Sequence, residues 1–365
     1  MSIPDRLLMG PGPSNVSPAV LEALAKPITG HLDPEFLHLL DEVAERLRLV
    51  FQTTNRMTFA VSGTGSAGME AALVNGIEPG DTAVVCVNGV FGGRMSEIAS
   101  RAGANVVRVE TEWGELIDLA ALREALDANP DAKVVAAVHA ETSTGAAQPI
   151  EDVATIVRDH GALLVVDAVT SLAGMPVAVD EWGIDVCYSG TQKCLSVPPG
   201  LAPITFSERA LHAVNTRKTP VQSWYLDVTL LSKYWGEDRV YHHTAPISML
   251  NALHAGLDLV LDEGLEVRWK RHAELGAMLA KELESRGFAY VAPEGHRLPM
   301  LHCVRVPAGV DEAAARKRLL TALGIEVGGG LGPFAGKCWR IGLMGYTCTE
   351  RNVLTFLAAL DDVLQ

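Results

Sequence analysis

The run Ala162-Leu-Leu-Val-Val-Asp167 places five apolar residues in succession and ends in a carboxylate. Continuous rather than alternating apolar residues are typical of strands buried on both faces. Further candidate strands are Thr58–Val61, Thr82–Val87, Asn105–Glu110, Lys133–His139, Asp185–Ser189 and Pro203–Phe206. Segments with apolar residues at helical spacing, such as 118–128 and 150–159, lie between them. The alternation predicts an α/β fold with a mainly parallel sheet covered by helices.

After Ser207 the pattern changes. Residues 216–238 are rich in Trp, Tyr and Lys and indicate an ordered loop, and 246–287 indicates helix interrupted near Gly264. The rest predicts a smaller α+β domain, with strands at Pro299–Val306, Ile325–Gly328 and Cys338–Leu343 and helices at Ala313–Leu323 and Glu350–Leu364. We therefore expect an N-terminal segment over 1–14, a large domain over 15–263 and a small domain over 264–365.

Composition excludes several classes of function. The 365 residues carry a formal net charge of −14, which disfavours nucleic-acid and anionic-membrane partners. Six scattered cysteines without a C-x-x-C pair predict reduced thiols and no metal site. The sequence shows neither a signal peptide nor a membrane-length apolar run, so the expected location is the cytoplasm.

Asp167 and Lys193 each follow a predicted buried strand. Ligands of open α/β sheets bind outside the carboxyl ends of strands, so both side chains point toward an expected site. Asp167 could instead cap a helix, and a lysine is usually a solvated charge. However, a buried lysine lowers its pKa and can form a Schiff base with a carbonyl. Together the pair fits pyridoxal phosphate, with Asp167 at the ring nitrogen and Lys193 at the aldehyde.

A glycine-rich turn, Ser62-Gly-Thr-Gly-Ser-Ala-Gly68, follows one strand and opens a helix predicted at Met69–Val74. Free amides at a helix start favour an anion. A nucleotide could use such a turn too, but it lacks the Lys-Ser/Thr ending of a P-loop. The phosphate of a cofactor is the better interpretation.

Arg340 lies in an apolar predicted strand, where a guanidinium needs a partner such as a substrate carboxylate or an acidic residue of the other domain. Tyr241-His-His-Thr244 could suggest a metal site. Adjacent histidines on a strand point to opposite faces, so a hydrogen-bonding loop is the better interpretation.

These motifs resemble the class V (fold type I) pyridoxal-phosphate aminotransferases, and within them the alanine–glyoxylate and serine–glyoxylate enzymes. The resemblance spans nearly the whole chain. Its motifs are Gly10-Pro-Gly-Pro-Ser-Asn15, Ser62-Gly-Thr-Gly65, Asn88-Gly-Val-Phe-Gly92, Glu141-Thr-Ser-Thr-Gly145, Val166-Asp-Ala-Val169, Ser189-Gly-Thr-Gln-Lys193, Tyr241-His-His-Thr244, Gly328-Gly-Gly-Leu-Gly-Pro333 and Arg340-Ile-Gly-Leu-Met-Gly345.

The resemblance implies a role for each matching residue. Lys193 would bind the cofactor and shuttle the proton, and Arg340 would bind the substrate carboxylate with help from Gly12, Tyr241 and His31. The implied cofactor-binding residues are Thr64, Gly65, Ser66, Phe91, Thr142, Asp167, Val169, Gln192, Lys193, Tyr241 and Thr244. Tyr241 and Thr244 would reach the neighbouring subunit's site, which implies a homodimer. Phe91 stands where relatives often have Trp, and Ser66 where some have His.

The implied reaction is transfer of the amino group of L-alanine, with L-serine as a further donor, to glyoxylate by a ping-pong mechanism. (S)-Ureidoglycine–glyoxylate and serine–pyruvate transamination are the alternatives. The ureidoglycine enzymes typically have Asn at the position of Tyr241 and Gln at that of His31, so this chain favours alanine or serine. A lyase or cysteine desulfurase of the same fold is the alternative from a different class. The donor, the pathway and any assembly beyond a dimer are not decided by the sequence.

Overall fold

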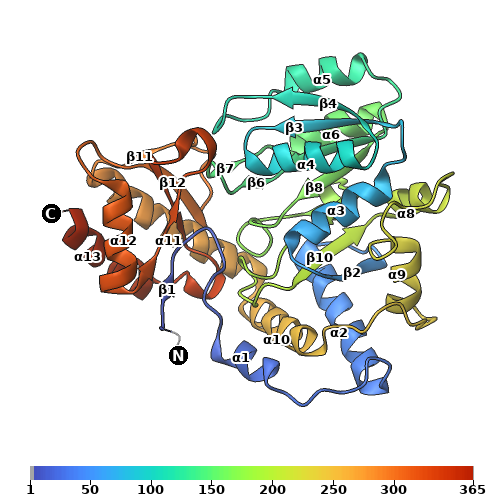
Figure 1. The fold of residues 1–365 in the computed structure, drawn as a ribbon, viewed down its shortest axis with the longest axis horizontal. Helices are drawn as coiled ribbons and strands as arrows, with labels where there is room; N and C mark the ends of the chain where they lie inside the picture. The colour runs from blue at the N-terminus through green and yellow to red at the C-terminus, as the bar shows by residue number, and fades with distance from the viewer. Residues whose placement is uncertain (1–3, 365) are drawn as a thin grey trace.

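A computed structural model describes residues 4–364, which form two lobes (Figure 1). The predicted N-terminal segment begins at residue 1, so its first three residues, like residue 365, lie outside the described residues. The chain passes from the large lobe to the small one where α10 (Ile247–Glu263) ends and α11 (Leu265–Ser285) begins. Gly264, with a φ of 82°, ends α10 in a backbone conformation that side chains disfavour. The helix break expected near Gly264 is confirmed.

The large lobe is built on a seven-stranded sheet in the order β2-β10-β9-β8-β5-β3-β4. Its strands are β2 (Met57–Ser62), β3 (Thr82–Val87), β4 (Asn105–Glu110), β5 (Val134–Val138), β8 (Leu163–Asp167), β9 (Val186–Tyr188) and β10 (Leu201–Phe206). All neighbours pair in parallel except β10, which is antiparallel to both β2 and β9. The predicted mainly parallel sheet is confirmed.

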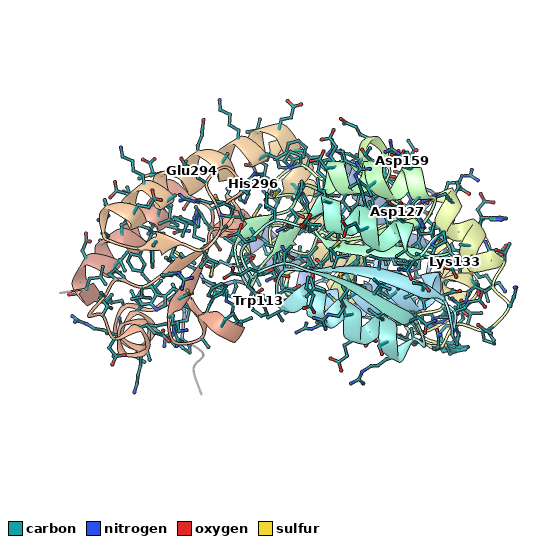
Figure 2. The ribbon with its side chains drawn as sticks, turned by 90° about the horizontal axis from the view of Figure 1, so that it is seen from above. Trp113, Asp127, Lys133, Asp159, Glu294 and His296 are labelled. Atoms are coloured by element: carbon teal, nitrogen blue, oxygen red, sulfur yellow. The ribbon has the colours of Figure 1, made fainter. Side chains whose placement is uncertain are left out.

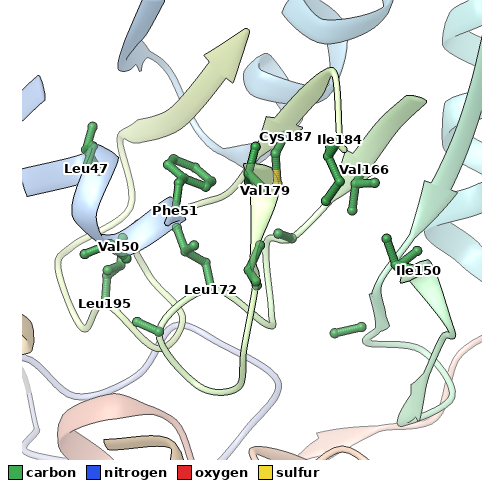
Figure 3. Close-up of a cluster of buried hydrophobic side chains, with 14 of the residues drawn as sticks. Leu47, Val50, Phe51, Ile150, Val166, Leu172, Val179, Ile184, Cys187 and Leu195 are labelled. Atoms are coloured by element: carbon green, nitrogen blue, oxygen red, sulfur yellow. The ribbon is translucent and has the colours of Figure 1, made fainter. Parts of the chain in front are cut away.

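Helices cover both faces of this sheet, which explains the continuous apolar strands. On one face lie α2 (Pro34–Phe51), α5 (Leu119–Asp127), α6 (Ile150–His160) and α10. On the other lie α3 (Gly65–Gly76), α4 (Val90–Arg101), α8 (Glu208–Asn215) and α9 (Val228–Trp235). In β8, Leu164 and Val166 face the first set and Leu163 and Val165 the second. Figure 3 shows Phe51 of α2, Leu172 and Val179 in the first of these two hydrophobic clusters.

The small lobe is a four-stranded antiparallel sheet with helices on it. The sheet order is β11-β12-β15-β14, and the strands are β11 (Ala289–Tyr290), β12 (Leu301–Arg305), β14 (Gly328–Gly329) and β15 (Cys338–Gly342). The helices α11, α12 (Glu312–Leu323) and α13 (Glu350–Leu364) pack against it around the buried Trp339. The N-terminal β1 (Leu7–Leu8) pairs in parallel with β13 (Ile325–Glu326). The N-terminal segment therefore packs on the small lobe.

Two expectations need correction. The predicted loop 216–238 contains the helix α9, whose N-cap Asp227 accepts a hydrogen bond from the amide of Thr229. Val228, Leu231 and Tyr234 are its buried face, a pattern too short to stand out among the surrounding aromatic residues. The expected strand 325–328 is two strands, β13 and β14, which belong to different sheets. Within residues 4–364, no helix is both long and apolar enough to span a bilayer.

The two lobes meet around Trp113, which Figure 2 shows between them. The centroid of the indole ring lies 6.2 Å from that of the Phe334 ring in the small lobe. At Gly332, a Cβ would lie only 2.6 Å from the indole, so a glycine is needed there. Cys303, Phe334 and Cys338 form a small apolar cluster against Trp113. This contact holds the small-lobe sheet, and with it Arg340, against the large lobe.

Candidate active site

A cavity of about 140 Å³ opens beside the carboxyl ends of β5 and β8. It brings together nine of the predicted cofactor residues, namely Thr64, Gly65, Ser66, Phe91, Thr142, Asp167, Val169, Gln192 and Lys193. Met69, Arg94, Val138 and Ala140 complete its lining. The residues come from five separate segments of the chain. Their meeting at one edge of the sheet is what the parallel topology requires.

The Lys193 side chain is only 8% exposed, so the alternative of a solvated surface charge is wrong. Its ammonium donates a hydrogen bond to the Pro11 carbonyl. Burial, aided by the charge of Arg340, lowers the pKa of Lys193 to about 8. A larger part of this amine is therefore neutral near neutral pH than for an ordinary lysine, and the neutral amine is the nucleophile.

The loop that carries Lys193 is fastened to the N-terminal segment and to the small lobe. Ser14 Oγ donates to the Lys193 carbonyl at 2.7 Å, and the Ser14 amide donates to the Gln192 carbonyl at 2.9 Å. From the small lobe, Arg268 Nη2 donates to the Cys194 carbonyl at 2.6 Å. Gly12 packs so tightly that a Cβ there would lie 2.8 Å from Lys193 Nζ. The lysine therefore has little freedom, as expected of a preorganised reactive group.

Asp167 ends β8 and is almost completely buried. Its carboxylate accepts hydrogen bonds from the Val169 amide and the Tyr188 hydroxyl, both at 2.8 Å. Tyr188 stands opposite Asp167 in the register of β8 and β9, which explains the contact. Burial raises the pKa of Asp167 to about 6, although these two donors and the charge of Lys193 oppose the rise. A cationic partner would stabilise the ionised form of such a buried carboxylate.

The glycine-rich turn leads directly into α3, which begins at Gly65, four residues earlier than expected. Thr64 is the N-cap, and its side chain makes no capping hydrogen bond. The first amides of α3 are thus free of a side-chain acceptor, as an anion site requires. A Cβ at Gly65 would lie 3.1 Å from a methyl of Val169, so a side chain there would crowd Val169 at the cavity wall.

Glu141 is a fully buried carboxylate, and the sequence motif that contains it predicts no role for it. Its oxygens accept hydrogen bonds from the amide and hydroxyl of Ser143 and from the Phe91 amide, at 3.0, 2.6 and 3.2 Å. Burial raises the pKa of Glu141, and the charge of Asp167 raises it further. The contacts join the start of α4 to the loop that carries Thr142. Glu141 thereby holds the backbone at Phe91.

None of the remaining predicted residues lines the cavity, namely Gly12, His31, Tyr241, Thr244 and Arg340. Arg340 donates from Nε to the Gly329 carbonyl at 2.8 Å, and no carboxylate within residues 4–364 forms an ion pair with it. This excludes the interdomain salt bridge, while the charge of Arg340 depresses the pKa of Lys193. Tyr241 and His31 lie together, with ring centroids 5.1 Å apart, and neither lines the cavity. Thr244 is likewise absent from the cavity lining, and Tyr241 is 56% exposed.

The Tyr241–Thr244 segment is tied down by its histidines. His243 Nε2 lies 2.7 Å from Ser62 Oγ, and His242 stacks on Trp224 at a centroid distance of 4.4 Å. The segment is therefore the hydrogen-bonding loop that the sequence favoured. Among residues 4–364, no group of three or more His, Cys, Asp or Glu side chains is placed to hold a metal ion.

The donor set fits the predicted cofactor. Pyridoxal phosphate presents an aldehyde, a phosphate and a ring nitrogen. The cavity offers an amine at Lys193, a helix start at Gly65 and a carboxylate at Asp167. Gln192 Oε1 is buried without a hydrogen-bond partner among the described residues, as expected of a group that awaits a ligand. The cavity thus supplies a binding group for each of these three parts of the cofactor: Lys193, the Gly65 turn and Asp167.

The chain is similar to known proteins over nearly its whole length. The family model described as Aminotransferase class-V matches residues 7–351. The chain is 43% identical to the (S)-ureidoglycine–glyoxylate transaminase of Bacillus subtilis, covering 99% of this chain and 91% of that protein. It is 41% identical to the alanine–glyoxylate aminotransferase of Mus musculus, covering 100% and 89%. A crystal structure of an alanine–glyoxylate aminotransferase from Nostoc sp. matches with a TM-score of 0.98 and 48% identity, covering 100% and 97%.

Proposed function

The chain belongs to the class-V aminotransferases, which depend on pyridoxal phosphate, and from this premise we propose that it transfers the amino group of L-alanine to glyoxylate. The products would be pyruvate and glycine, formed by a ping-pong mechanism. The observation that carries the proposal is the cavity in which a buried Lys193 and Asp167 stand beside an uncapped helix start. Full-length similarity to relatives named for this reaction supports the choice of substrates.

Lys193 is the residue that we assign to chemistry. When bound, pyridoxal phosphate supplies an aldehyde carbon open to amines and a ring that withdraws electrons. With its pKa near 8, Lys193 Nζ can both bind that carbon as a neutral amine and carry a proton. Asp167 would hold the ring nitrogen protonated. Val169 and Phe91 would pack on the ring, and Thr142 would form a hydrogen bond at the ring hydroxyl. Thr64, Gly65, Ser66 and Gln192 would bind the phosphate.

Arg340 would bind the substrate carboxylate. Its Nε donates a hydrogen bond to the Gly329 carbonyl. No acidic residue among residues 4–364 forms an ion pair with its Nη1 or Nη2. A planar guanidinium suits a carboxylate, and both alanine and glyoxylate carry one. Gly12 lies against Lys193 and would help to bind this substrate. The same arginine could therefore serve both halves of a ping-pong reaction.

We also propose a homodimer in which each subunit completes its partner's site. Tyr241, Thr244 and His31 do not line the cavity of their own chain, and Tyr241 is exposed. Mixing Lys193→Ala chains with Tyr241→Ala chains tests the sharing directly. A hybrid dimer would keep one site with both native residues, so activity should reappear on mixing. No recovery from verified hybrid dimers would contradict a shared site.

The domain limits 1–14, 15–263 and 264–365 and a cytoplasmic location complete the proposal. The pairing of β1 with β13 suggests that the N-terminal segment moves with the small domain. Six free, buried cysteines are compatible with a reducing compartment.

Transamination of (S)-ureidoglycine with glyoxylate is the second candidate, because the Bacillus subtilis relative carries that name. The ureidoglycine pattern has other residues at the positions of Tyr241 and His31, which favours alanine or serine as the donor. The two rings lie together here, with centroids 5.1 Å apart. A panel of alanine, serine and ureidoglycine with glyoxylate decides between them. We expect kcat/KM for alanine to exceed that for ureidoglycine by about tenfold or more. A reversed order would overturn the assignment, and Lys193→Ala gives the background rate.

A further inference from the structure

Arg94 lines the cofactor cavity but has no assigned role. It lies on α4, one helical turn after Phe91, and its guanidinium carbon is 5.0 Å from the centroid of the Phe91 ring. Its Nη1 donates a hydrogen bond to Ser66 Oγ at 3.3 Å. Arg94 therefore spans the distance between the Phe91 ring and the glycine-rich turn at the start of α3.

Arg94 also forms no ion pair among the described residues, although its charge helps to lower the pKa of Asp167. No carboxylate among residues 4–364 lies within ion-pair distance of it, whereas Arg101 on the same helix pairs with Glu97 at 2.6 Å. The residues that line the cavity include two cations, Arg94 and Lys193, and one carboxylate, Asp167. In a chain with a net charge of −14, an unpaired arginine beside an anion-binding turn is a charge available to a ligand.

We propose that Arg94 binds the phosphate group of the cofactor through the Ser66 side of the turn. A guanidinium presents two parallel N–H groups to a phosphate and remains charged at every relevant pH. The free amides at Gly65 and the hydroxyl of Ser66 supply only neutral donors to a group that carries nearly two negative charges. Arg94 contacts that turn directly through Ser66, so it can act as a counter-charge from the same subunit.

The inference rests on the pyridoxal-phosphate dependence described above and is independent of the amino donor. A second use of Arg94 can be separated from it. The cation–π contact would position the Phe91 ring and would act on the pyridine ring of the cofactor rather than on its phosphate. The two uses differ in how they treat pyridoxal, which has the same ring and aldehyde but lacks the phosphate.

The test is a binding titration of the apoenzyme with pyridoxal phosphate and, separately, with pyridoxal, followed by tryptophan fluorescence. The variants are Arg94→Gln and Arg94→Lys, and Arg101→Gln is the control on the same helix. We expect Arg94→Gln to weaken binding of pyridoxal phosphate by about tenfold to a hundredfold, as for the loss of a charge-assisted hydrogen bond. Binding of pyridoxal should stay within about twofold of the native value.

Arg94→Lys keeps the charge and loses the fork, so it should give an intermediate loss for the phosphate form alone. Inorganic phosphate should compete with pyridoxal phosphate less effectively in Arg94→Gln than in native protein or Arg101→Gln. Equal weakening of both ligands would assign Arg94 to the ring, and unchanged binding of both would leave it no role in binding. Either result overturns the proposal. A native apoenzyme that binds neither ligand would instead refute the proposed function.

Discussion

Replacing Asp167 by asparagine should stabilise the protein without cofactor at neutral pH while it abolishes activity. Burial raises the pKa of this carboxyl from 3.8 to about 6. The folded state therefore favours the protonated acid, and its contribution to stability is complete below about pH 4. That contribution is lost as the pH rises from about 4 to about 6, because the buried carboxylate must then be charged.

The size of the effect follows from the shift. A rise of about two pH units corresponds to about 3 kcal/mol at 1.36 kcal/mol per unit. Asparagine does not ionise, so the difference in free energy of unfolding between Asp167→Asn and native apoenzyme should move by up to about 3 kcal/mol in favour of the variant between pH 4 and pH 7. Histidines buried in the neutral form also titrate at low pH, but they contribute equally to both proteins and cancel.

Urea unfolding of both apoenzymes at equal protein concentration, followed by circular dichroism from pH 4 to pH 7.5, measures this difference. Asp185→Asn is the matched control, because Asp185 is equally buried but accepts a hydrogen bond from Arg209 Nε at 2.9 Å. Loss of that carboxylate should destabilise the fold at pH 7 by about 2 kcal/mol. A pH-independent difference for Asp167→Asn, or destabilisation of it at pH 7, would refute the reasoning.

Three further substitutions test the site. Gly12→Ala should lower kcat by tenfold or more, since Gly12 has a φ of 107° and its Cβ would crowd Lys193 Nζ; an active variant would contradict the tight packing. Arg340→Lys should raise KM for both alanine and glyoxylate by about tenfold with cofactor binding unchanged, and a KM effect on only one of them would argue against a shared carboxylate site. Tyr188→Phe should raise the pKa of Asp167 further and weaken cofactor binding by about tenfold in a pH-dependent titration; native affinity would show that the 2.8 Å hydrogen bond is dispensable.

The site residues that follow the carboxyl ends of buried strands could be predicted from the sequence. Lys193 and Asp167 follow buried strands, and parallel strands deliver their carboxyl ends to one edge, so their proximity follows from topology. The glycine-rich turn at Gly65 could be predicted too, because it also follows a buried strand. Arg340 was placed by its apolar surroundings, which predict a guanidinium with a specific partner.

Other residues of the site could not be found by this reasoning, because their positions depend on contacts between elements. Arg94 reads as an ordinary helical cation, and only the packing of α4 against α3 brings it to Ser66. Glu141 lies in a polar motif that gives no sign of complete burial. The one available signal for Tyr188 was its alignment with Asp167 in neighbouring strands, which requires the register of β8 and β9.

The central claim is that Lys193 is the residue through which the protein holds pyridoxal phosphate. The most direct measurement is peptide mapping by mass spectrometry after the holoenzyme is reduced with borohydride. The account predicts a reduced pyridoxyl phosphate group on the peptide that contains Lys193, and loss of that label in Lys193→Ala. A label on another lysine, or an unlabelled native protein that is fully active, would contradict it.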